Sequence, residues 1–221
     1  MEVYDAMRTT FAARDYTDTE VSDETLHRIL DNARFAPSGG NRQGWKIVVV
    51  KDRQTRIRLT EILGPTIRQY RACQSIGETP FTSIGETQVT QAMINETPTS
   101  FPLVDTLEDV PALLVVCVDL KEVCSFDKDL DRVGVISGGS VYPFAWNILL
   151  AARNEDLGGV LTTYLAHQEE EVRNLLDVPD DHAIAAMISI GEPVKQLTNL
   201  KRNPVHSFTV VDRFTGSVFK G

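Results

Sequence analysis

The sequence predicts a single domain of mixed α and β structure over residues 1–221, and three observations favour this fold class. A chain of 221 residues is close to the size of one compact domain. Segments with the apolar period of a helix are interspersed with short aliphatic runs typical of strands. Their order shows no regular strand–helix–strand repeat, and no G-x-G-x-x-G motif follows a strand, so a dinucleotide-binding parallel sheet is not supported.

Helices are predicted where apolar residues recur every three or four positions. Four segments have this pattern, at 21–35, 53–70, 137–154 and 168–177. Ser22 is the expected N-cap of the first helix, because its hydroxyl can accept a hydrogen bond from a free N–H of the first turn. Gly64-Pro65 is expected to break or kink the second helix, since proline has no N–H and its ring clashes with the preceding turn.

Strands are predicted for short runs rich in β-branched and aliphatic residues. These runs lie at 46–51, 112–119, 160–164 and 183–190, and a last extended segment is expected at 205–211. The second run is continuously apolar, which is typical of a strand covered on both faces. We expect the first run, KIVVVK, to be buried as well, and Gly158-Gly159 to end the helix that precedes the third run.

Charge and composition argue against several kinds of function. The formal net charge of −9 disfavours a nucleic-acid partner and requires that any bound phosphate be held by a few specific cations. No stretch approaches the roughly 20 apolar residues of a membrane helix, and the acidic start of the chain lacks the apolar region of a secretory signal. Three cysteines without a CxxC pair and four scattered histidines predict reduced thiols, a cytoplasmic location and no metal site.

Residues 72–109 differ from the rest of the chain. They are rich in Thr, Ser, Gly and Pro, they lack periodic apolar residues, and the pentapeptide SIGET occurs in them twice. A long irregular segment inside a compact domain is usually either functional or disordered. We interpret this insertion as a mobile cover, or lid, over a site; a surface insertion without a role is the alternative.

Four groups of residues could carry chemistry, although ordinary turns and solvated charges would contain the same residue types. The stretch APSGGNRQGW at 36–45 combines small residues with amide side chains that suit the edge of a heterocycle. Arg8 and Arg14 form one basic patch and Lys201-Arg202 another, and together they could neutralise a phosphate dianion. The stretch LGGVLTT at 157–163 could offer backbone N–H groups and hydroxyls to a ligand.

The order and spacing of these groups resemble the nitroreductase family of flavoproteins. The matching motifs are APSGGNRQGW with the run KIVVV behind it, VPALLVVCVD, GSVYP continuing as NILLAARNEDLGGVLTT, and IGEPV followed by KRNP. The resemblance covers nearly the whole chain except about 72–109. It implies an α+β fold of nitroreductase type, in which a central, mostly antiparallel sheet is flanked by helices and two copies form an intertwined homodimer.

The resemblance also implies an FMN cofactor at the dimer interface, held by both subunits. Arg14 resembles the basic residue that meets the phosphate and the C2 carbonyl side of the flavin, and Arg202, with Lys201 beside it, resembles the C-terminal phosphate ligand. The loop residues that would pack on the isoalloxazine from the other subunit are Pro37, Ser38, Gly39 and Asn41. The segment whose backbone would approach flavin N5 comprises Gly159, Leu161, Thr162 and Thr163.

The sequence departs from the family pattern in two places, the stretch from Thr10 to Ala12 and Trp146. Thr10, Phe11 and Ala12 stand where Arg and Ser are often found, and Arg8 is the residue that could compensate in holding the phosphate. Trp146 stands where the family often has Gln, so a polar contact to the flavin would be missing there.

The implied function is that of an FMN-dependent oxidoreductase that passes hydride from NADPH or NADH through flavin N5 to an electron-poor small molecule, such as a nitroaromatic or a quinone. No dedicated acid, base or nucleophile is required, because the cofactor carries the chemistry. Three alternatives stay open: a flavoenzyme with specialised chemistry such as reductive dehalogenation or an oxidase-type dehydrogenation, a protein that sequesters FMN with little turnover, and a flavin-free interaction module. The expected protein partner is a second copy, whose sheet edge residues 205–215 would join.

Overall fold

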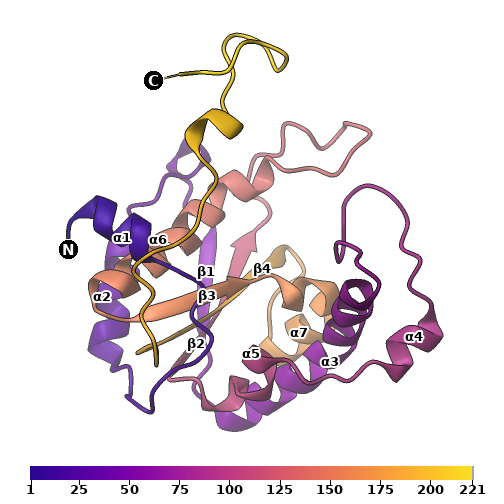
Figure 1. Cartoon of the computed structure of the whole chain (residues 1–221). Coiled ribbons are helices and arrows are strands. Elements are labelled where there is room, and N and C mark those ends of the chain that lie inside the picture. Colours follow the sequence, from indigo (N-terminus) through magenta and orange to yellow (C-terminus); the bar gives the residue numbers. More distant parts are fainter. Residues whose placement is uncertain (221) are drawn as a thin grey trace.

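The chain forms a four-stranded antiparallel sheet with helices on both faces (Figure 1). The structure is a computed structural model that describes residues 1–220. Its strands are β1 (Trp45–Val49), β2 (Ala112–Asp119), β3 (Gly158–Thr162) and β4 (His182–Gly191). Its helices are α1 (Val3–Thr9), α2 (Asp23–Ala33), α3 (Arg53–Ser75), α4 (Gln91–Glu96), α5 (Pro102–Asp105), α6 (Tyr142–Asn154) and α7 (Glu169–Leu176). The strand order β1-β2-β4-β3, with antiparallel pairing throughout, confirms the predicted α+β fold class.

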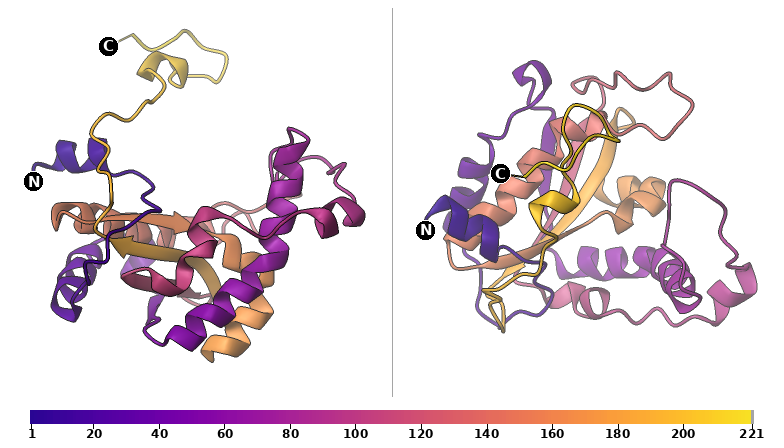
Figure 2. Two further views of the ribbon diagram at one scale, coloured as in Figure 1. Left: turned by 60° about the horizontal axis from the view of Figure 1, so that its bottom comes forward. Right: turned by 45° about the horizontal axis from the view of Figure 1, so that its top comes forward.

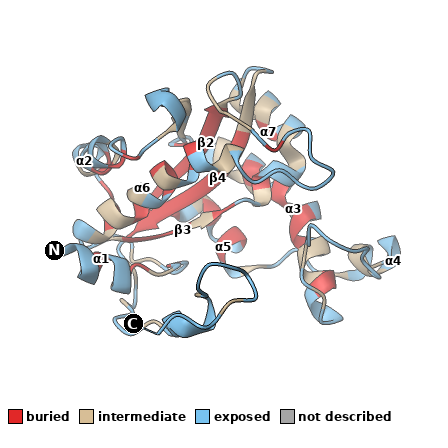
Figure 3. Cartoon of the chain, turned by 90° about the horizontal axis from the view of Figure 1, so that it is seen from above, coloured by how far each residue is buried: buried red, intermediate tan, exposed pale blue. Residues whose placement is uncertain are grey.

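Two apolar clusters fill the space between the sheet and the helices. Because side chains alternate across a strand, Leu114 and Val116 of β2 pack with α2 and α6, whereas Leu113 and Val115 pack with α3 and α7. The inner strands are therefore buried on both faces, as Figure 3 shows. The continuous apolar run of β2 predicted this position correctly.

The first predicted strand is an edge strand rather than a buried one. β1 pairs with β2 alone, and within residues 1–220 no strand pairs with its other side. Its residues are accordingly half-buried or exposed, with Val49 36% accessible. The strand begins one residue earlier than expected, at Trp45, whose ring stacks on Phe144 with 4.5 Å between the ring centroids.

Helix α2 begins where the sequence predicts. The Oγ of Ser22 accepts a hydrogen bond from the N–H of Thr25 at 3.2 Å, which confirms the N-cap. Leu26, Ile29 and Ala33 are buried against the sheet, so one face of the helix forms part of the core.

We expected Gly64-Pro65 to break or kink helix α3; the helix does not break there but runs from Arg53 to Ser75. A proline inside a helix removes one backbone hydrogen bond and costs about 3 kcal/mol. Leu63 and Ile67, on either side of the proline, are completely buried in the second apolar cluster. Their burial holds both halves of the helix against the same core and offsets the local penalty.

Two further predictions are corrected near the third strand and at the C-terminus. Gly158 and Gly159 do not end the preceding helix; α6 ends at Asn154, and the glycines begin β3. The segment 205–211 is not extended, because it opens with a 3₁₀ turn, η5 (Val205–Ser207), and the N–H of Val211 then donates to the carbonyl of Ser217 at 2.9 Å. This tail projects away from the body of the molecule in Figures 1 and 2.

The insertion at 72–109 is more regular than its composition indicated. It contains the end of α3, then α4 and α5, and the 3₁₀ turn η2 (Leu107–Asp109). The Arg71 guanidinium donates to the carbonyls of Pro98 and Ser100, so the segment leaves α3 and returns to it.

None of the helices within residues 1–220 has both the length and the apolar character needed to cross a bilayer.

Candidate functional site

The N-terminal segment that carries Arg14 lies beside β3. Ala12 forms an isolated parallel bridge with Gly159, and the N–H of Ala13 donates to the Gly159 carbonyl at 3.1 Å. The structure therefore brings together two of the predicted groups, Arg14 and the segment from Gly159 to Thr163. Arg14 is exposed, and its guanidinium makes one hydrogen bond, to the Ala12 carbonyl at 3.2 Å.

Tyr16 fixes the position of this segment. Its hydroxyl donates to the Ala13 carbonyl at 2.7 Å and lies 2.8 Å from the Oγ of Ser189 in β4. Burial raises the pKa of Tyr16 to about 12, although the hydrogen bond with Ser189 opposes the shift. The hydroxyl therefore remains a hydrogen-bond donor throughout the physiological pH range, and the backbone before Arg14 stays attached to the sheet.

Gly159 is required by close packing. A Cβ at this position would lie 2.7 Å from the Ser189 carbonyl oxygen and 2.8 Å from Cδ2 of Leu149. Contacts this short do not occur for real Cβ atoms, so a larger residue would push β3 away from β4 or α6. At the neighbouring Gly158, an added Cβ would lie 3.0 Å from the Cβ of Ala13, so the absence of a side chain there lets the Arg14 segment approach the strand.

Thr162 at the end of β3 carries a buried polar atom that lacks a partner. The residue is 7% exposed, and within residues 1–220 its Oγ1 makes no hydrogen bond. Leaving a buried hydroxyl unsatisfied costs roughly 1–3 kcal/mol. The neighbouring Leu161 is half-buried against the first apolar cluster, and Thr163 is exposed.

The Pro37–Asn41 loop forms a second surface. The N–H of Gly39 donates to the Oγ of Ser140 at 3.1 Å, and the Oγ of Ser38 accepts from the N–H of Gln43 at 2.9 Å. Asn41 has a φ of 54°, a left-handed conformation that asparagine tolerates better than most residues. Within residues 1–220, no hydrogen bond or ion pair links this loop to Arg14 or β3.

Within residues 1–220, no hydrogen bond joins the predicted phosphate-binding residues Lys201 and Arg202 to Arg14. Lys201 and Arg202 are exposed, and the Arg202 guanidinium donates only to the Lys201 carbonyl, at 2.8 Å. Thr10 is buried, and its hydroxyl already donates to the Ala6 carbonyl at 2.7 Å. Arg8 is exposed and lies over the ring of Tyr4, 5.9 Å from the centroid.

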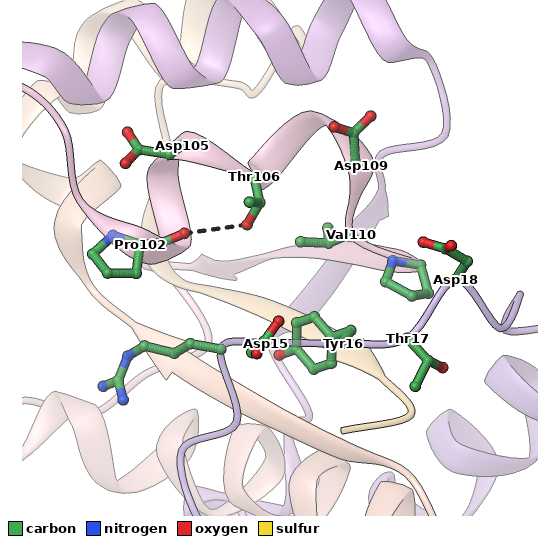
Figure 4. Close-up of a pocket in the computed structure, with 11 residues that line it drawn as sticks. Asp15, Tyr16, Thr17, Asp18, Pro102, Asp105, Thr106, Asp109 and Val110 are labelled. Atoms are coloured by element: carbon green, nitrogen blue, oxygen red, sulfur yellow. Dashed lines mark hydrogen bonds between the residues drawn. The ribbon is translucent and has the colours of Figure 1, made fainter. Parts of the chain in front are cut away.

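A cavity of about 510 Å³ opens between residues 14–18 and the segment 102–111 (Figure 4). Arg14 is the only residue that it shares with the predicted flavin ligands. Its other charged lining residues are Asp15, Asp18, Asp105 and Asp109. Carboxylates repel a phosphate, so this cavity is not suited to the phosphate end of a nucleotide.

An aromatic cluster that the sequence did not reveal lies near these elements. Tyr70 of α3, Phe101 before α5 and Tyr164 contact one another edge to face, with ring centroids 5.4 to 6.1 Å apart. Tyr164 begins the 3₁₀ turn η4 (Tyr164–Gln168). Its place directly after Thr163 was the one sequence signal that could have linked the cluster to the predicted site. Phe101 lies in the insertion, where no periodicity could assign it to a packed position.

These residues fit the isoalloxazine end of FMN better than its phosphate end. Arg14 supplies an exposed cation beside β3, and Thr162 supplies a buried hydroxyl that needs a partner. Phe11 and Ala12 offer no side-chain donor, and the Thr10 hydroxyl is already engaged. The chain thus fits the cofactor at the ring, and its phosphate would depend on Lys201 and Arg202.

Comparisons with known proteins point to one family. The model of the Nitroreductase family matches residues 7–192. An NADH dehydrogenase/NAD(P)H nitroreductase homologue of Archaeoglobus fulgidus is 27% identical over 182 residues, covering 81% of this chain and 79% of the relative. An iodotyrosine deiodinase of Nematostella vectensis is 24% identical over 213 residues, covering 95% of this chain and 75% of the relative.

A solved structure shows the same fold. The NADPH:FMN oxidoreductase of Vibrio harveyi, solved with NAD+, matches with a TM-score of 0.66 at 20% identity. The match covers 96% of this chain and 77% of that one. Identity at this level supports the fold alone.

Proposed function

The chain belongs to the nitroreductase family, and we propose that it is an FMN-dependent oxidoreductase that uses NADPH or NADH to reduce an electron-poor small molecule. The observation that carries this proposal is the exposed cation Arg14, which the bridge between Ala12 and Gly159 sets beside β3, with the buried hydroxyl of Thr162 at the end of the same strand. When bound, FMN would accept hydride from the nicotinamide and pass the electrons to the acceptor.

The residues of the chain would bind and orient the cofactor. The positive charge of Arg14 favours a flavin that carries negative charge, because opposite charges attract strongly where water is partly excluded. The Thr162 hydroxyl would donate a hydrogen bond to the ring system, and Lys201 and Arg202 would hold the phosphate. The exposed backbone of Gly39 and Gly40 leaves room for a flat ring to approach the Pro37–Asn41 loop.

We propose that this loop acts on the cofactor of a second copy, in a homodimer. The loop does not contact Arg14 or β3 within the described part of one chain, which is expected if each site takes residues from two subunits. Exposed apolar side chains on α1, α6 and the C-terminal tail support an interface there; they include Tyr4, Met7, Tyr142, Trp146, Phe208 and Phe214. Trp146 is 43% exposed and would be covered by the partner. We also propose that the protein is cytoplasmic.

The proposal is tested on purified protein loaded with FMN. We expect the flavin absorbance to bleach when NADPH or NADH is added without oxygen, and to return when nitrobenzene or benzoquinone is added. Size-exclusion chromatography of the same sample should give twice the 24.6 kDa chain mass. Binding of FMN without reduction by either nicotinamide would favour the FMN-sequestering alternative, and a folded protein that binds no FMN would contradict the proposal.

Reductive dehalogenation is the second candidate, and the similarity to the Nematostella vectensis deiodinase over 95% of this chain favours it. The same reduced protein would be mixed with an iodinated phenol. Release of iodide together with flavin reoxidation would support this activity. Reoxidation by nitrobenzene alone would exclude it under these conditions.

The Thr162→Val variant tests the role of the unpartnered hydroxyl. Valine has nearly the same shape but no polar atom, so the protein without flavin should lose no stability and should gain about 1 kcal/mol or more in its free energy of unfolding. FMN binding should weaken roughly 5- to 10-fold, because one hydrogen bond to the ring is lost. Urea unfolding and flavin fluorescence titration measure the two effects. A destabilised flavin-free variant would show instead that the hydroxyl has a partner within the chain.

A further inference from the structure

Tyr16 closes a short loop of the chain around Arg14. The Tyr16 hydroxyl donates to the carbonyl of Ala13, three residues earlier, at 2.7 Å. Arg14 and Asp15 are the two residues between these points, and Figure 4 shows Asp15, Tyr16 and Thr17 along the same segment. The backbone that carries the Arg14 side chain is therefore fixed by a side chain only two positions away.

The Ser189 hydroxyl determines the direction of this hydrogen bond. Ser189 lies in β4 and is 1% exposed, and its Oγ is 2.8 Å from the Tyr16 hydroxyl oxygen. A tyrosine hydroxyl has one proton to donate, and the Ala13 carbonyl is a closer acceptor than the Ser189 carbonyl, which lies at 3.2 Å. Ser189 must then donate its own proton to the Tyr16 oxygen. The result is a directed chain of hydrogen bonds from Ser189 through Tyr16 to Ala13.

The segment is also held on the side away from β3. The N–H of Thr17 donates to the Glu192 carbonyl at 2.9 Å, and the N–H of Val194 donates to the Asp15 carbonyl at 3.1 Å. Together with the bridge to β3, these bonds hold the backbone on both sides of Arg14. The guanidinium has one intramolecular partner within residues 1–220, so most of its donors are available to a ligand.

Gly191 makes room for the Tyr16 ring. A Cβ at position 191 would lie 2.8 Å from Cδ1 of Tyr16 and 2.8 Å from Cγ of Pro111. Burial raises the pKa of Tyr16 to about 12, and the positive charge of Arg14 opposes this shift. The Arg14 guanidinium is therefore close enough for its charge to act at the Tyr16 hydroxyl, and the two side chains are linked through the backbone and through space.

We propose that Tyr16, with Ser189 behind it, is a positioning residue for the contact between Arg14 and the flavin, and that it acts on the relative affinity for reduced and oxidised FMN. This inference rests on the proposed oxidoreductase function and adds two residues that do not touch the cofactor. A charge attracts less strongly as its distance grows, so an Arg14 released from its frame would bind the flavin less tightly. The loss should be larger for reduced FMN, whose ring carries more negative charge.

The test compares variants with and without Arg14. Tyr16→Phe removes the hydroxyl and keeps the ring, and Ser189→Ala removes the donor behind it; each is made alone and together with Arg14→Ala. Thr60→Val is the matched control, because the half-buried Thr60 hydroxyl also donates to a backbone carbonyl, that of Arg56 in α3. Flavin fluorescence gives the dissociation constant of oxidised FMN. A titration with dithionite gives the midpoint potential, and from it the affinity for reduced FMN.

We expect Tyr16→Phe to weaken the binding of oxidised FMN about 3-fold and that of reduced FMN about 10-fold, and so to lower the midpoint potential. Ser189→Ala should change both affinities in the same direction but less, because the bond from Tyr16 to Ala13 remains. Neither substitution should weaken binding further once Arg14 is alanine, since the residue through which they act is gone. Thr60→Val should leave both affinities unchanged.

Equal losses with and without Arg14 would show that Tyr16 is only structural and would overturn the inference, as would an unchanged ratio of the two affinities. Because dithionite replaces the nicotinamide, dependence on Arg14 in a protein that neither nicotinamide reduces would support the inference and contradict the proposed function alone. A folded wild type that binds no FMN would contradict both. If Tyr16→Phe does not fold, Ser189→Ala provides the same comparison.

Hydrogen exchange of the flavin-free protein tests the first step separately. The Ala13 N–H donates to the Gly159 carbonyl, and it should exchange faster in Tyr16→Phe than in the wild type, because the Ala13 carbonyl has lost its partner. The same amide should be unaffected in Thr60→Val. Wild-type exchange at Ala13 in Tyr16→Phe would show that the hydroxyl does not hold this segment and would overturn the inference.

Discussion

Replacing Gly159 with alanine is expected to lower the free energy of unfolding by about 1–3 kcal/mol, the usual cost of overpacking a filled core. The added methyl would lie 2.7 Å from the Ser189 carbonyl oxygen, which belongs to the neighbouring strand and cannot rotate away. β3 would have to shift, and the Arg14 segment that pairs with it would shift too. Urea unfolding followed by circular dichroism measures the loss.

Gly139→Ala is the matched control for this experiment. Gly139 lies in the 3₁₀ turn η3 (Ser137–Ser140), where an added Cβ would meet no atom within 4 Å. The control should unfold within about 0.5 kcal/mol of the wild type. Equal stability of the two alanine variants would contradict the view that close packing, rather than backbone freedom, requires glycine at 159.

Arg14→Ala is expected to weaken FMN binding about 10- to 100-fold. A hydrogen bond to a charged group contributes roughly 1.5–3 kcal/mol, and each 1.4 kcal/mol corresponds to a factor of ten in affinity. Flavin fluorescence quenching measures the dissociation constant. Arg58→Ala is the control, since Arg58 carries the same charge but pairs with Glu61 on the exposed face of α3.

Riboflavin, which lacks the phosphate, identifies the part of the cofactor that Arg14 contacts. If Arg14 meets the ring, the variant should lose affinity for riboflavin and for FMN by the same factor. If it meets the phosphate, only FMN binding should weaken. Unchanged affinity for both flavins would show that Arg14 is not a ligand at all.

The sequence predicted the parts of the fold that local chemistry determines. Ser22 caps α2 because a serine before a helix satisfies a free N–H whatever the rest of the chain does. β2 lies inside the sheet because its long, continuous apolar run is most stable when both faces of the strand are covered. Both features follow from a few neighbouring residues, so sequence reasoning could recover them.

Features that depend on distant residues were mispredicted. Pro65 should end a helix by its own chemistry, yet tertiary packing of Leu63 and Ile67 carries α3 past it. The run at 46–51 is as apolar as a central strand, and only the sheet topology makes β1 an edge. The 205–211 segment favours extension locally but turns back on itself through the contact between Val211 and Ser217.

The candidate site was predictable only as separate pieces. The structure joins Arg14 to β3 through the bridge between Ala12 and Gly159, which no local pattern indicated. No hydrogen bond within residues 1–220 joins the Pro37–Asn41 loop to Arg14 or β3, and the two-subunit site that the resemblance implies stays a prediction. The Tyr70–Phe101–Tyr164 cluster was missed because its members lie 31 and 63 positions apart in the sequence (70 to 101, and 101 to 164).

The hydrogen bonds from Arg71 to Pro98 and Ser100 have a consequence for how such a protein could change over generations. Because of these hydrogen bonds, residues 72–100 form a closed loop that begins after Arg71 on α3 and returns to the same residue. Doubling the length of a closed loop costs only about 0.6 kcal/mol in chain entropy, so this stretch could be lengthened, trimmed or exchanged while the sheet stays intact.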